Sequence, residues 1–202
     1  NLHNLGMAGN WNALADTANG EFLAIIGDDD RILPDFVTRL VNALQSGADV
    51  GFAHHYLIND RGERLESETI ENTRRYRRDQ LPPGELSNPE IWVWQNVLPM
   101  SGTLARTVEI RRHRFKEDLN TPEIELFVRL AQAGGRFVFV PEYLAEYRVH
   151  AQSATAAGLW SERLVERLVP IAAHPQAEPF KRTLLAPMII NSVSRCLLAG
   201  DR

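Results

Sequence analysis

The chain has 202 residues, a length that fits one sizeable domain with its own hydrophobic core. Its net charge of -4 excludes the broad basic field that attracts nucleic acid, so we expect no nucleic-acid partner. The single cysteine, Cys196, excludes an internal disulfide and fits a reducing compartment such as the cytoplasm. No apolar run approaches the ~18 residues of a membrane span, which predicts no transmembrane segment.

The first part of the chain alternates helices and strands. It begins NLHNLGMAGNWN, without an initiator Met, and we expect an upstream segment to be absent. The pattern predicts a helix over 10–18, a strand over 21–26, a helix over 34–47 and a strand over 49–58 that turns into a short hairpin. The first helix has Asn10 as its predicted N-cap and an apolar stripe of Trp11, Leu14, Ala15 and Ala18.

Residues 66–89 lose this periodicity and predict a long loop rich in charge, proline and glycine. Four arginines gather in it, and they form either a lid that grips phosphate or, as we prefer, a solvated surface. They are Arg74, Arg75, Arg77 and Arg78.

The remainder predicts a short helix over 88–96, a strand over 101–106, a helical turn or two over 107–112 and a clear helix over 121–135. Two short strands broken at Pro141 follow. Two amphipathic helices, one beginning near Trp160 and one near Leu184, close the chain. We therefore expect an α/β fold, a mixed sheet flanked by helices, over 1–155, and a C-terminal helical extension over 156–202.

The acidic triplet Asp28, Asp29 and Asp30 directly follows an apolar strand. Carboxylates at the carboxyl end of a strand suit Mg²⁺ or Mn²⁺, and ligand sites of open α/β sheets lie at this edge. The alternative is a solvated turn whose aspartates cap the helix that starts near Pro34.

Two blocks of the sequence, within residues 4–155, resemble family-2 glycosyltransferases of the GT-A fold. The first is NLGMAGNWNALADTANGEFLAIIGDDDRILPDF and the second is PEIELFVRLAQAGGRFVFVPEYLAEYRVH. The matching positions of the first block are Asn4, Gly6, Asn12, Ala18, Gly20, Glu21, Phe22, the triplet and Pro34. The resemblance implies a Rossmann-like sheet that lacks its N-terminal strands, which hold the nucleobase, so this chain alone would bind a nucleotide sugar poorly.

The resemblance implies inverting transfer of a sugar from a nucleotide diphosphate sugar to an acceptor hydroxyl. The acidic loop would hold the metal ion, Mn²⁺ or Mg²⁺, as Asp28 with Asp30 or as Asp29 with Asp30, with Asp30 the favoured ligand. Asp28 would otherwise contact ribose or sugar. His150 is a further candidate metal ligand, and the candidate donor contacts are Asp28, Asp29, Asn12 and Arg148.

The family's general base maps to Glu123, and Asp118 and Glu117 are fallback candidates. Two departures stand out: Gly27 and Pro122 occupy positions that are acidic in many members. Glu123 lies in the first turn of a helix, where we expect the helix dipole to keep its carboxylate ionised. A purely structural role at the helix N-terminus is the alternative.

Other residues receive weaker interpretations. Trp92, Trp94 and residues 100–102 fall where the family builds its acceptor pocket, although tryptophans are as easily core. His54 and His55 are more plausibly structural than ligands.

The family further suggests a carbohydrate or lipid-linked acceptor, polysaccharide or cell-envelope synthesis, a cytoplasmic site at the inner face of the membrane, and a homodimer through the C-terminal helices. A non-catalytic relative is the main alternative. A phosphotransfer enzyme ranks last, because the chain has no phosphate-cradling loop.

Overall fold

The computed structural model describes residues 3–119, 121–150 and 162–199. One mixed sheet forms its centre, with strand order β1-β5-β3-β6-β2 and with β4 also paired to β6. The two longest strands, β3 and β6, run parallel, and the other pairs are antiparallel. The strands are β1 (Phe22–Leu23), β2 (Arg31–Ile32), β3 (Val50–Ile58), β4 (Gly84–Glu85), β5 (Thr103–Arg106) and β6 (Phe137–Arg148).

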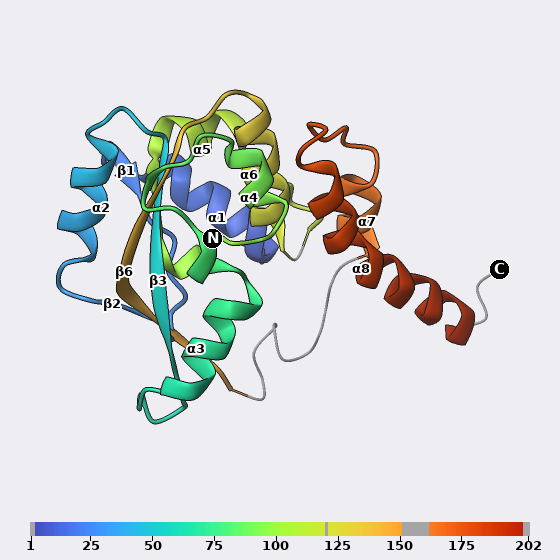
Figure 1. The fold of residues 1–202 in the computed structure, drawn as a ribbon, viewed down its shortest axis with the longest axis horizontal. Coiled ribbons are helices and arrows are strands. Elements are labelled where there is room, and N and C mark those ends of the chain that lie inside the picture. The colour runs from blue at the N-terminus through green and yellow to red at the C-terminus, as the bar shows by residue number, and fades with distance from the viewer. Residues whose placement is uncertain (1–2, 120, 151–161, 200–202) are drawn as a thin grey trace.

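Helices cover the sheet on both faces (Figure 1). Helix α2 (Phe36–Leu44) buries Phe36, Leu40 and Leu44 in a small core on one face. The larger core, on the other face, includes side chains of α1 (Gly6–Thr17), α4 (Pro89–Val93), α5 (Thr107–His113) and α6 (Pro122–Gln132). The expected α/β architecture is therefore confirmed, with one thin and one thick helical layer.

Helix α1 begins four residues before the predicted N-cap Asn10. Gly6 adopts a φ of 67°, and its N–H donates to Oδ1 of Asn4, which starts the helix there. The predicted apolar stripe is wrong at Leu14, which is 49% exposed, because α1 packs through small residues. The buried positions are Ala8, Gly9, Asn12 and Ala15.

The predicted loop over 66–89 is wrong in its first part, which forms α3 (Glu66–Arg75). Acidic residues occupy its first turn and Arg74 and Arg75 its last, an arrangement that complements the helix dipole. The Leu57 N–H donates to Thr69 Oγ1 at 2.9 Å, which fixes α3 against the edge of β3. The short 3₁₀ helix η1 (Arg78–Gln80) and β4 follow.

Three further predictions need correction. The predicted strand over 21–26 pairs only at Phe22–Leu23 within the described residues. The two predicted strands around Pro141 form one strand, β6, whose pairing with β3 shifts register between Ala53 and His55. The predicted strand over 101–106 starts with a 3₁₀ turn, η2 (Met100–Gly102), and the expected hairpin is reduced to a single bridge between Ile58 and Arg64.

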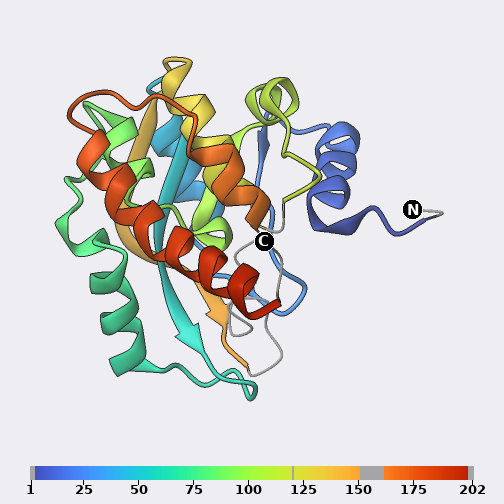
Figure 2. The ribbon, with the colours of Figure 1, turned by 90° about the vertical axis from the view of Figure 1, so that its right-hand side faces the viewer.

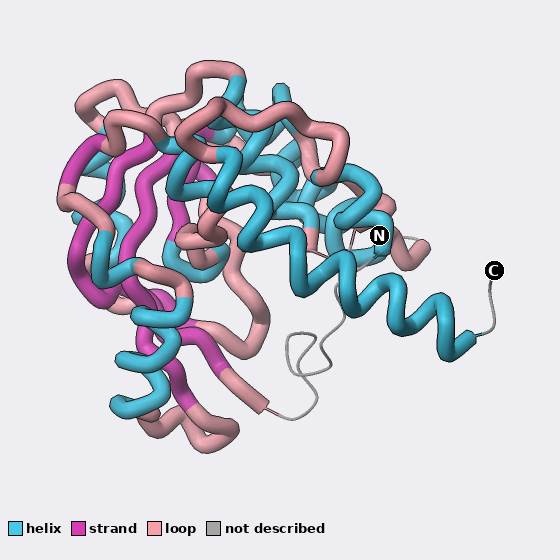
Figure 3. Tube along the Cα trace, turned by 45° about the vertical axis from the view of Figure 1, so that its right-hand side comes forward, coloured by secondary structure: helices cyan, strands magenta, loops and turns pink. Residues whose placement is uncertain are grey.

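The C-terminal helices α7 (Glu162–Leu168) and α8 (Glu178–Ala199) pack on the sheet's thick layer (Figures 1 and 2). Leu164, Leu168 and Leu185 belong to the same hydrophobic core as Trp94. Figure 3 shows α8 running on past this contact to the C-terminal end. The predicted boundary at 155/156 lies outside the described residues. No described helix is both long and apolar enough to span a membrane.

Candidate active site

The acidic triplet lies where the ends of three segments meet. The carboxyl ends of β3 and β6 reach this edge, and the chain leaving β1 reaches it through residues 24–27. Arg148, the last residue of β6, joins the three segments: its guanidinium donates to the carbonyl oxygens of Asp29, Asn59 and Asp60, at 2.9, 2.5 and 3.1 Å. The tertiary structure therefore fixes the acidic loop in place.

Asp30 is the most constrained carboxylate of the triplet. Its Oδ1 accepts the Arg148 backbone N–H at 2.9 Å, and its Oδ2 accepts a hydrogen bond from the Ser101 hydroxyl. Partial burial raises the pKa of Asp30 above its ordinary value, the two hydrogen bonds oppose this rise, and the neighbouring Asp29 adds to it. The two hydrogen bonds therefore hold the Asp30 carboxylate in a fixed position, as for a metal ligand. Because the group is partly buried, a cation stabilises its charged form more than water does.

Asp29 and His150 form the second contact of the site. Nε2 of His150 lies 3.1 Å from Oδ2 of Asp29. A side chain at position 27 would bring its Cβ within 2.9 Å of Asp29 Oδ1 and 3.1 Å of Asp30 Oδ2. Gly27 departs from the family pattern, and its lack of a side chain therefore avoids a clash with these two carboxylates. Asp28 is exposed.

The donor set of this loop is chemically suited to a hard divalent cation. Mg²⁺ is commonly bound through one or two carboxylates plus substrate phosphates, and imidazole is acceptable to Mn²⁺. Asp29 and His150 provide such donors in direct contact, and the adjacent Asp30 provides a third, whose pKa is raised by burial. In the described part of the chain no group of three or more His, Cys, Asp or Glu side chains is already arranged around a metal position. The residues therefore fit a cation that shares its coordination with a substrate.

Asn12, a predicted donor contact, is 3% exposed and has a structural task. Its Nδ2 donates to the Phe115 carbonyl oxygen at 2.9 Å and to Glu117 Oε1 at 3.1 Å, and its Oδ1 accepts the Phe115 N–H. These bonds clamp α1 to the segment before α6. The predicted contact of Asn12 with a donor stays untested.

Glu123, the predicted general base, follows Thr121 and Pro122 at the start of α6. Its Oε2 is buried and has no hydrogen-bond partner among the described residues. Burial raises the pKa of Glu123 to about 7, and a bond to its own backbone N–H opposes this only weakly. Desolvation therefore outweighs the helix dipole, and the carboxylate is about half ionised at neutral pH where full ionisation was expected.

The N-terminus of α4 provides a comparison for the unpartnered side-chain oxygen of Glu123. Glu90 occupies the equivalent place in α4, after Asn88 and Pro89. There Oε1 accepts hydrogen bonds from Trp94 Nε1, Gln132 Nε2 and the His174 N–H. The fallback candidates resemble Glu90, since Asp118 pairs with Arg167 and Glu117 accepts from Asn12. Glu123 alone of these acids combines burial with an unpartnered oxygen, as a proton acceptor would.

The histidines of β3 form a buried basic cluster with Arg78. His54 stacks on Tyr143 at 4.9 Å, and burial lowers the pKa of His54 to about 4 and of His55 to about 3, assisted by Arg78. Arg78 is 3% exposed and donates to Asn72. The arginine run is thus divided: Arg78 is core, whereas Arg74, Arg75 and Arg77 are exposed.

Sequence reasoning missed the link between Ser101 and Asp30. Residues 100–102 had been associated with an acceptor pocket, but 71 residues separate the two partners and no local pattern signals the contact. Of the two tryptophans, Trp94 is completely buried and Trp92 is half-buried against the same core.

The architecture of the chain is that of the GT-A glycosyltransferases. The chain superposes on S. aureus TarS 1-349 in complex with UDP-GlcNAc with a TM-score of 0.58 at 17% identity, covering 91% of this chain and 52% of that one. It superposes on the mannosyltransferase PcManGT of Pyrobaculum calidifontis, in complex with GDP-Man and Mn²⁺, with a TM-score of 0.57 at 16% identity, covering 96% and 55%. The chain thus spans about half the length of these structures.

A family model also matches the first part of the sequence. Residues 1–91, a little under half of the chain, match the family model described as "Glycosyl transferase family 2". The match includes α1, the acidic triplet and all of β3. A comparison with curated protein sequences gave no match.

Proposed function

We propose that the protein is an inverting, metal-dependent glycosyltransferase that moves a sugar from a nucleotide diphosphate sugar to an acceptor hydroxyl. The contact of Asp29 with His150 beside the fixed carboxylate of Asp30, at the carboxyl edge of the sheet, carries this proposal. The family match over residues 1–91 supports it, and so do structural neighbours in complex with UDP-GlcNAc and with GDP-Man and Mn²⁺.

In this mechanism Asp30 and Asp29, with His150, would hold Mn²⁺ or Mg²⁺. The bound cation would neutralise charge on the diphosphate leaving group. Ser101 and the Arg148 N–H fix the Asp30 carboxylate, so that little reorganisation is needed when the donor binds. Asp28, which is exposed, would contact ribose or sugar.

Glu123 acts on the acceptor. Its carboxylate takes the proton of the attacking hydroxyl while the new bond from oxygen to the anomeric carbon forms and the bond to the phosphate oxygen breaks. A pKa of about 7 suits this task, because a general base works best when its pKa lies near the operating pH. A single displacement of this kind inverts the anomeric configuration.

Paramagnetic broadening by Mn²⁺ tests the metal site even at weak affinity. Mn²⁺ added to the isotope-labelled protein with UDP or GDP should broaden the amide signals of residues 27–30 and 148–150. Asp30→Asn should remove this effect, whereas Asp35→Asn, an exposed aspartate before α2, should retain it. Broadening that is unchanged in Asp30→Asn, or centred elsewhere, would contradict the proposal.

A non-catalytic relative is the second candidate, and Pro122 in place of an acidic residue favours it. Metal-dependent binding of a nucleotide sugar with no transfer to any acceptor, and no hydrolysis of the donor, would support that alternative.

The wider setting of the reaction is also proposed from the family. We place it in cell-envelope or polysaccharide synthesis, with a carbohydrate or lipid-linked acceptor, in the cytoplasm near the inner face of the membrane. A homodimer through α8 is compatible with the exposed side chains of Ile189, Ile190 and Val193, which are 39, 64 and 53% exposed. Sedimentation analysis of Ile190→Asp would test the dimer.

A further inference from the structure

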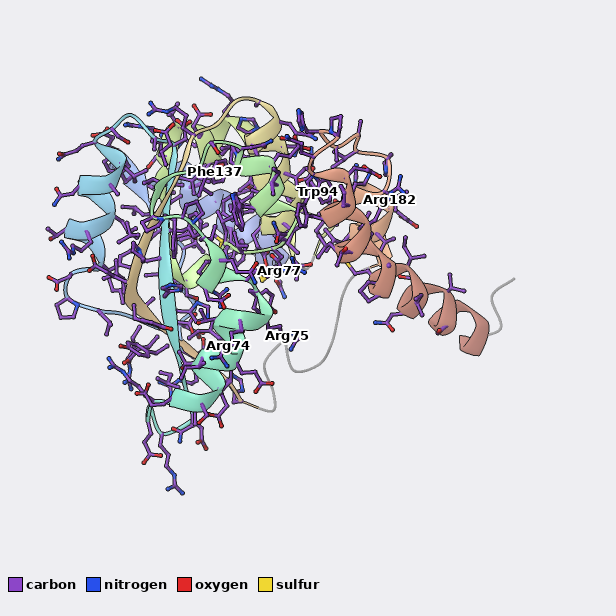
Figure 4. The ribbon with its side chains drawn as sticks, viewed as in Figure 1. Arg74, Arg75, Arg77, Trp94, Phe137 and Arg182 are labelled. Carbon is purple, nitrogen blue, oxygen red and sulfur yellow. The ribbon has the colours of Figure 1, made fainter. Side chains whose placement is uncertain are left out.

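A pocket lies between the end of α3, the end of α4 and the first half of α8. Its volume is about 440 Å³, which is within the range of small-molecule sites. Figure 4 shows Arg75 and Arg77 at the end of α3 that is nearer to α8. The pocket shares no lining residue with the acidic loop, so the metal site does not account for it.

Two of the lining residues are arginines whose charge is not neutralised. Arg75 and Arg77 are exposed, and neither forms an ion pair with a carboxylate in the described part of the chain. The Arg77 side chain makes a long hydrogen bond, 3.5 Å from Nη1 to Oε1 of Gln95. Arg182 on the adjacent face of α8 differs, because it pairs with Glu178 at 3.0 Å. The pocket therefore presents two guanidinium groups suited to a carboxylate or a phosphate.

The other lining residues suit a polyhydroxylated molecule. Gln95, Asn96, Thr183 and Asn191 provide amide and hydroxyl groups that can both donate and accept hydrogen bonds. Half-buried aromatic rings from Tyr76 and Phe180 provide apolar surface beside them. A sugar ring presents hydroxyl edges and an apolar C–H face, and this lining offers a counterpart for each.

Backbone conformation at the same place points to a specific site. Arg77 and Asn96 both line the pocket, and both adopt the left-handed conformation, with φ of 54° and 56°. Such a conformation is easily accepted by Asn, but for Arg it costs on the order of 1 kcal/mol and tends to persist at functional sites.

We propose that this pocket binds an anionic carbohydrate, a sugar unit that carries a carboxylate or a phosphate group. In the frame of the proposed function, on which this step rests, the sugar belongs to the acceptor at a position remote from the reacting hydroxyl. The pocket would then select charged acceptor chains.

Calorimetric titration with defined probes tests this assignment without any transfer reaction. The probes are trigalacturonate, for a carboxylate, and glucose 1,6-bisphosphate, for a phosphate. Maltotriose and tripolyphosphate serve as the uncharged sugar and the sugar-free anion. We expect at least one anionic sugar to bind, and to bind more tightly than both comparison compounds.

Two variants change different sides of the pocket. Arg75→Gln combined with Arg77→Gln removes the charge, and Thr183→Trp fills the space from the exposed face of α8. Each should weaken binding about tenfold or more, the arginine variant because it loses hydrogen bonds between charged groups and Thr183→Trp because the indole occupies the space of the ligand. Arg74→Gln is the matched control, since Arg74 is exposed on α3 but does not line the pocket. Circular dichroism checks that each variant folds.

Several outcomes would overturn the assignment: no binding of either anionic sugar, equal loss in Arg74→Gln, no loss in the two pocket variants, or tripolyphosphate binding as tightly as the sugars. Asp30→Asn should leave probe binding unchanged. Failure of the donor site and failure of this pocket are therefore distinguishable.

Discussion

Ser101 and Asp30 are joined by a hydrogen bond from the serine hydroxyl to Oδ2, across 71 residues of sequence. Ser101 lies in η2, immediately before β5, and Asp30 lies in the loop after β1. Gly102 packs beside it so closely that a Cβ there would lie 2.9 Å from the Ala53 carbonyl oxygen. The segment that precedes β5 is thereby attached to the candidate metal site.

Ser101→Ala should weaken Mn²⁺ binding, and more so in acid. The Ser101 hydrogen bond is the largest influence that lowers the pKa of Asp30 against burial, so its loss raises that pKa further. Protons then compete with the cation at a higher pH. We expect about a tenfold loss of Mn²⁺ affinity, as for other residues that support a metal ligand, with a larger loss at pH 5.5 than at pH 7.5.

Electron paramagnetic resonance titration of Mn²⁺ in the presence of GDP or UDP measures this effect. Ser46→Ala is the control, since the exposed Ser46 hydroxyl only donates to the Ala43 carbonyl oxygen. An affinity ratio between variant and wild type that is the same at both pH values would argue against a protonation effect at Asp30.

Arg148→Lys should destabilise the protein although it keeps the charge. The planar guanidinium reaches three carbonyl oxygens in two separate segments, and a single ammonium cannot reach all of them. We expect the free energy of unfolding to fall by about 1–3 kcal/mol in urea denaturation. Arg61→Lys, at an exposed site in the same turn, should be neutral within error. Equal stability of the two variants would show that Arg148 does not tie the strand ends together.

The sequence predicts the acidic loop and the order of helices and strands well, because both depend on local patterns. Apolar runs, the Thr121–Pro122 helix start and the Gly134 stop are all visible within a few residues. Helix α3 is missed because its mean hydropathy is low and its stabilising contact, Thr69 to the Leu57 N–H, comes from another element. Charge placement at its two ends is the signal that could have revealed it.

The burial of the site residues could not be predicted from the sequence. The position of Glu123 in a first helical turn suggests an ionised carboxylate, but its desolvation depends on side chains that surround it in the folded chain. The same holds for Arg78, which is adjacent in sequence to exposed Arg77 yet is buried next to His54 and His55. Burial is a property of the tertiary structure, and two adjacent residues of one turn can differ completely in their exposure.

The buried histidines should make the protein acid-sensitive. Burial, with the charge of Arg78, lowers the pKa of His54 to about 4 and of His55 to about 3; Asp79 opposes this at His54 and Asn72 at His55. The unfolded chain takes up protons near pH 6.5, before the folded chain does, so stability is complete above pH 6.5 and declines toward pH 4.

The decline should be about 1 kcal/mol per pH unit for each histidine. His54→Phe keeps a ring against Tyr143 and should flatten the profile measured by urea denaturation between pH 4.5 and 7. His3→Phe, at an exposed position, should keep the wild-type slope. A slope unaffected by His54→Phe would mean that other groups cause the acid sensitivity.

Glu123→Gln should separate the catalytic from the structural role of this residue. Because the folded-state pKa is about 7 and the ordinary value is 4.5, the folded protein holds a proton that the unfolded chain has lost between these values, and stability falls as pH rises through that window. Gln cannot ionise, so the variant should match wild type near pH 4 and exceed its stability at pH 8 by on the order of 3 kcal/mol. Sugar transfer should nonetheless fall about 10²- to 10⁴-fold, because the amide accepts no proton from the acceptor. Wild-type turnover should rise with pH through about 7.

Glu66→Gln, in the exposed first turn of α3, is the control and should alter neither stability nor sugar transfer. A gain in stability with full activity would identify Glu123 as a buried acid without a catalytic role, and would transfer the search for the base to Asp118 and Glu117.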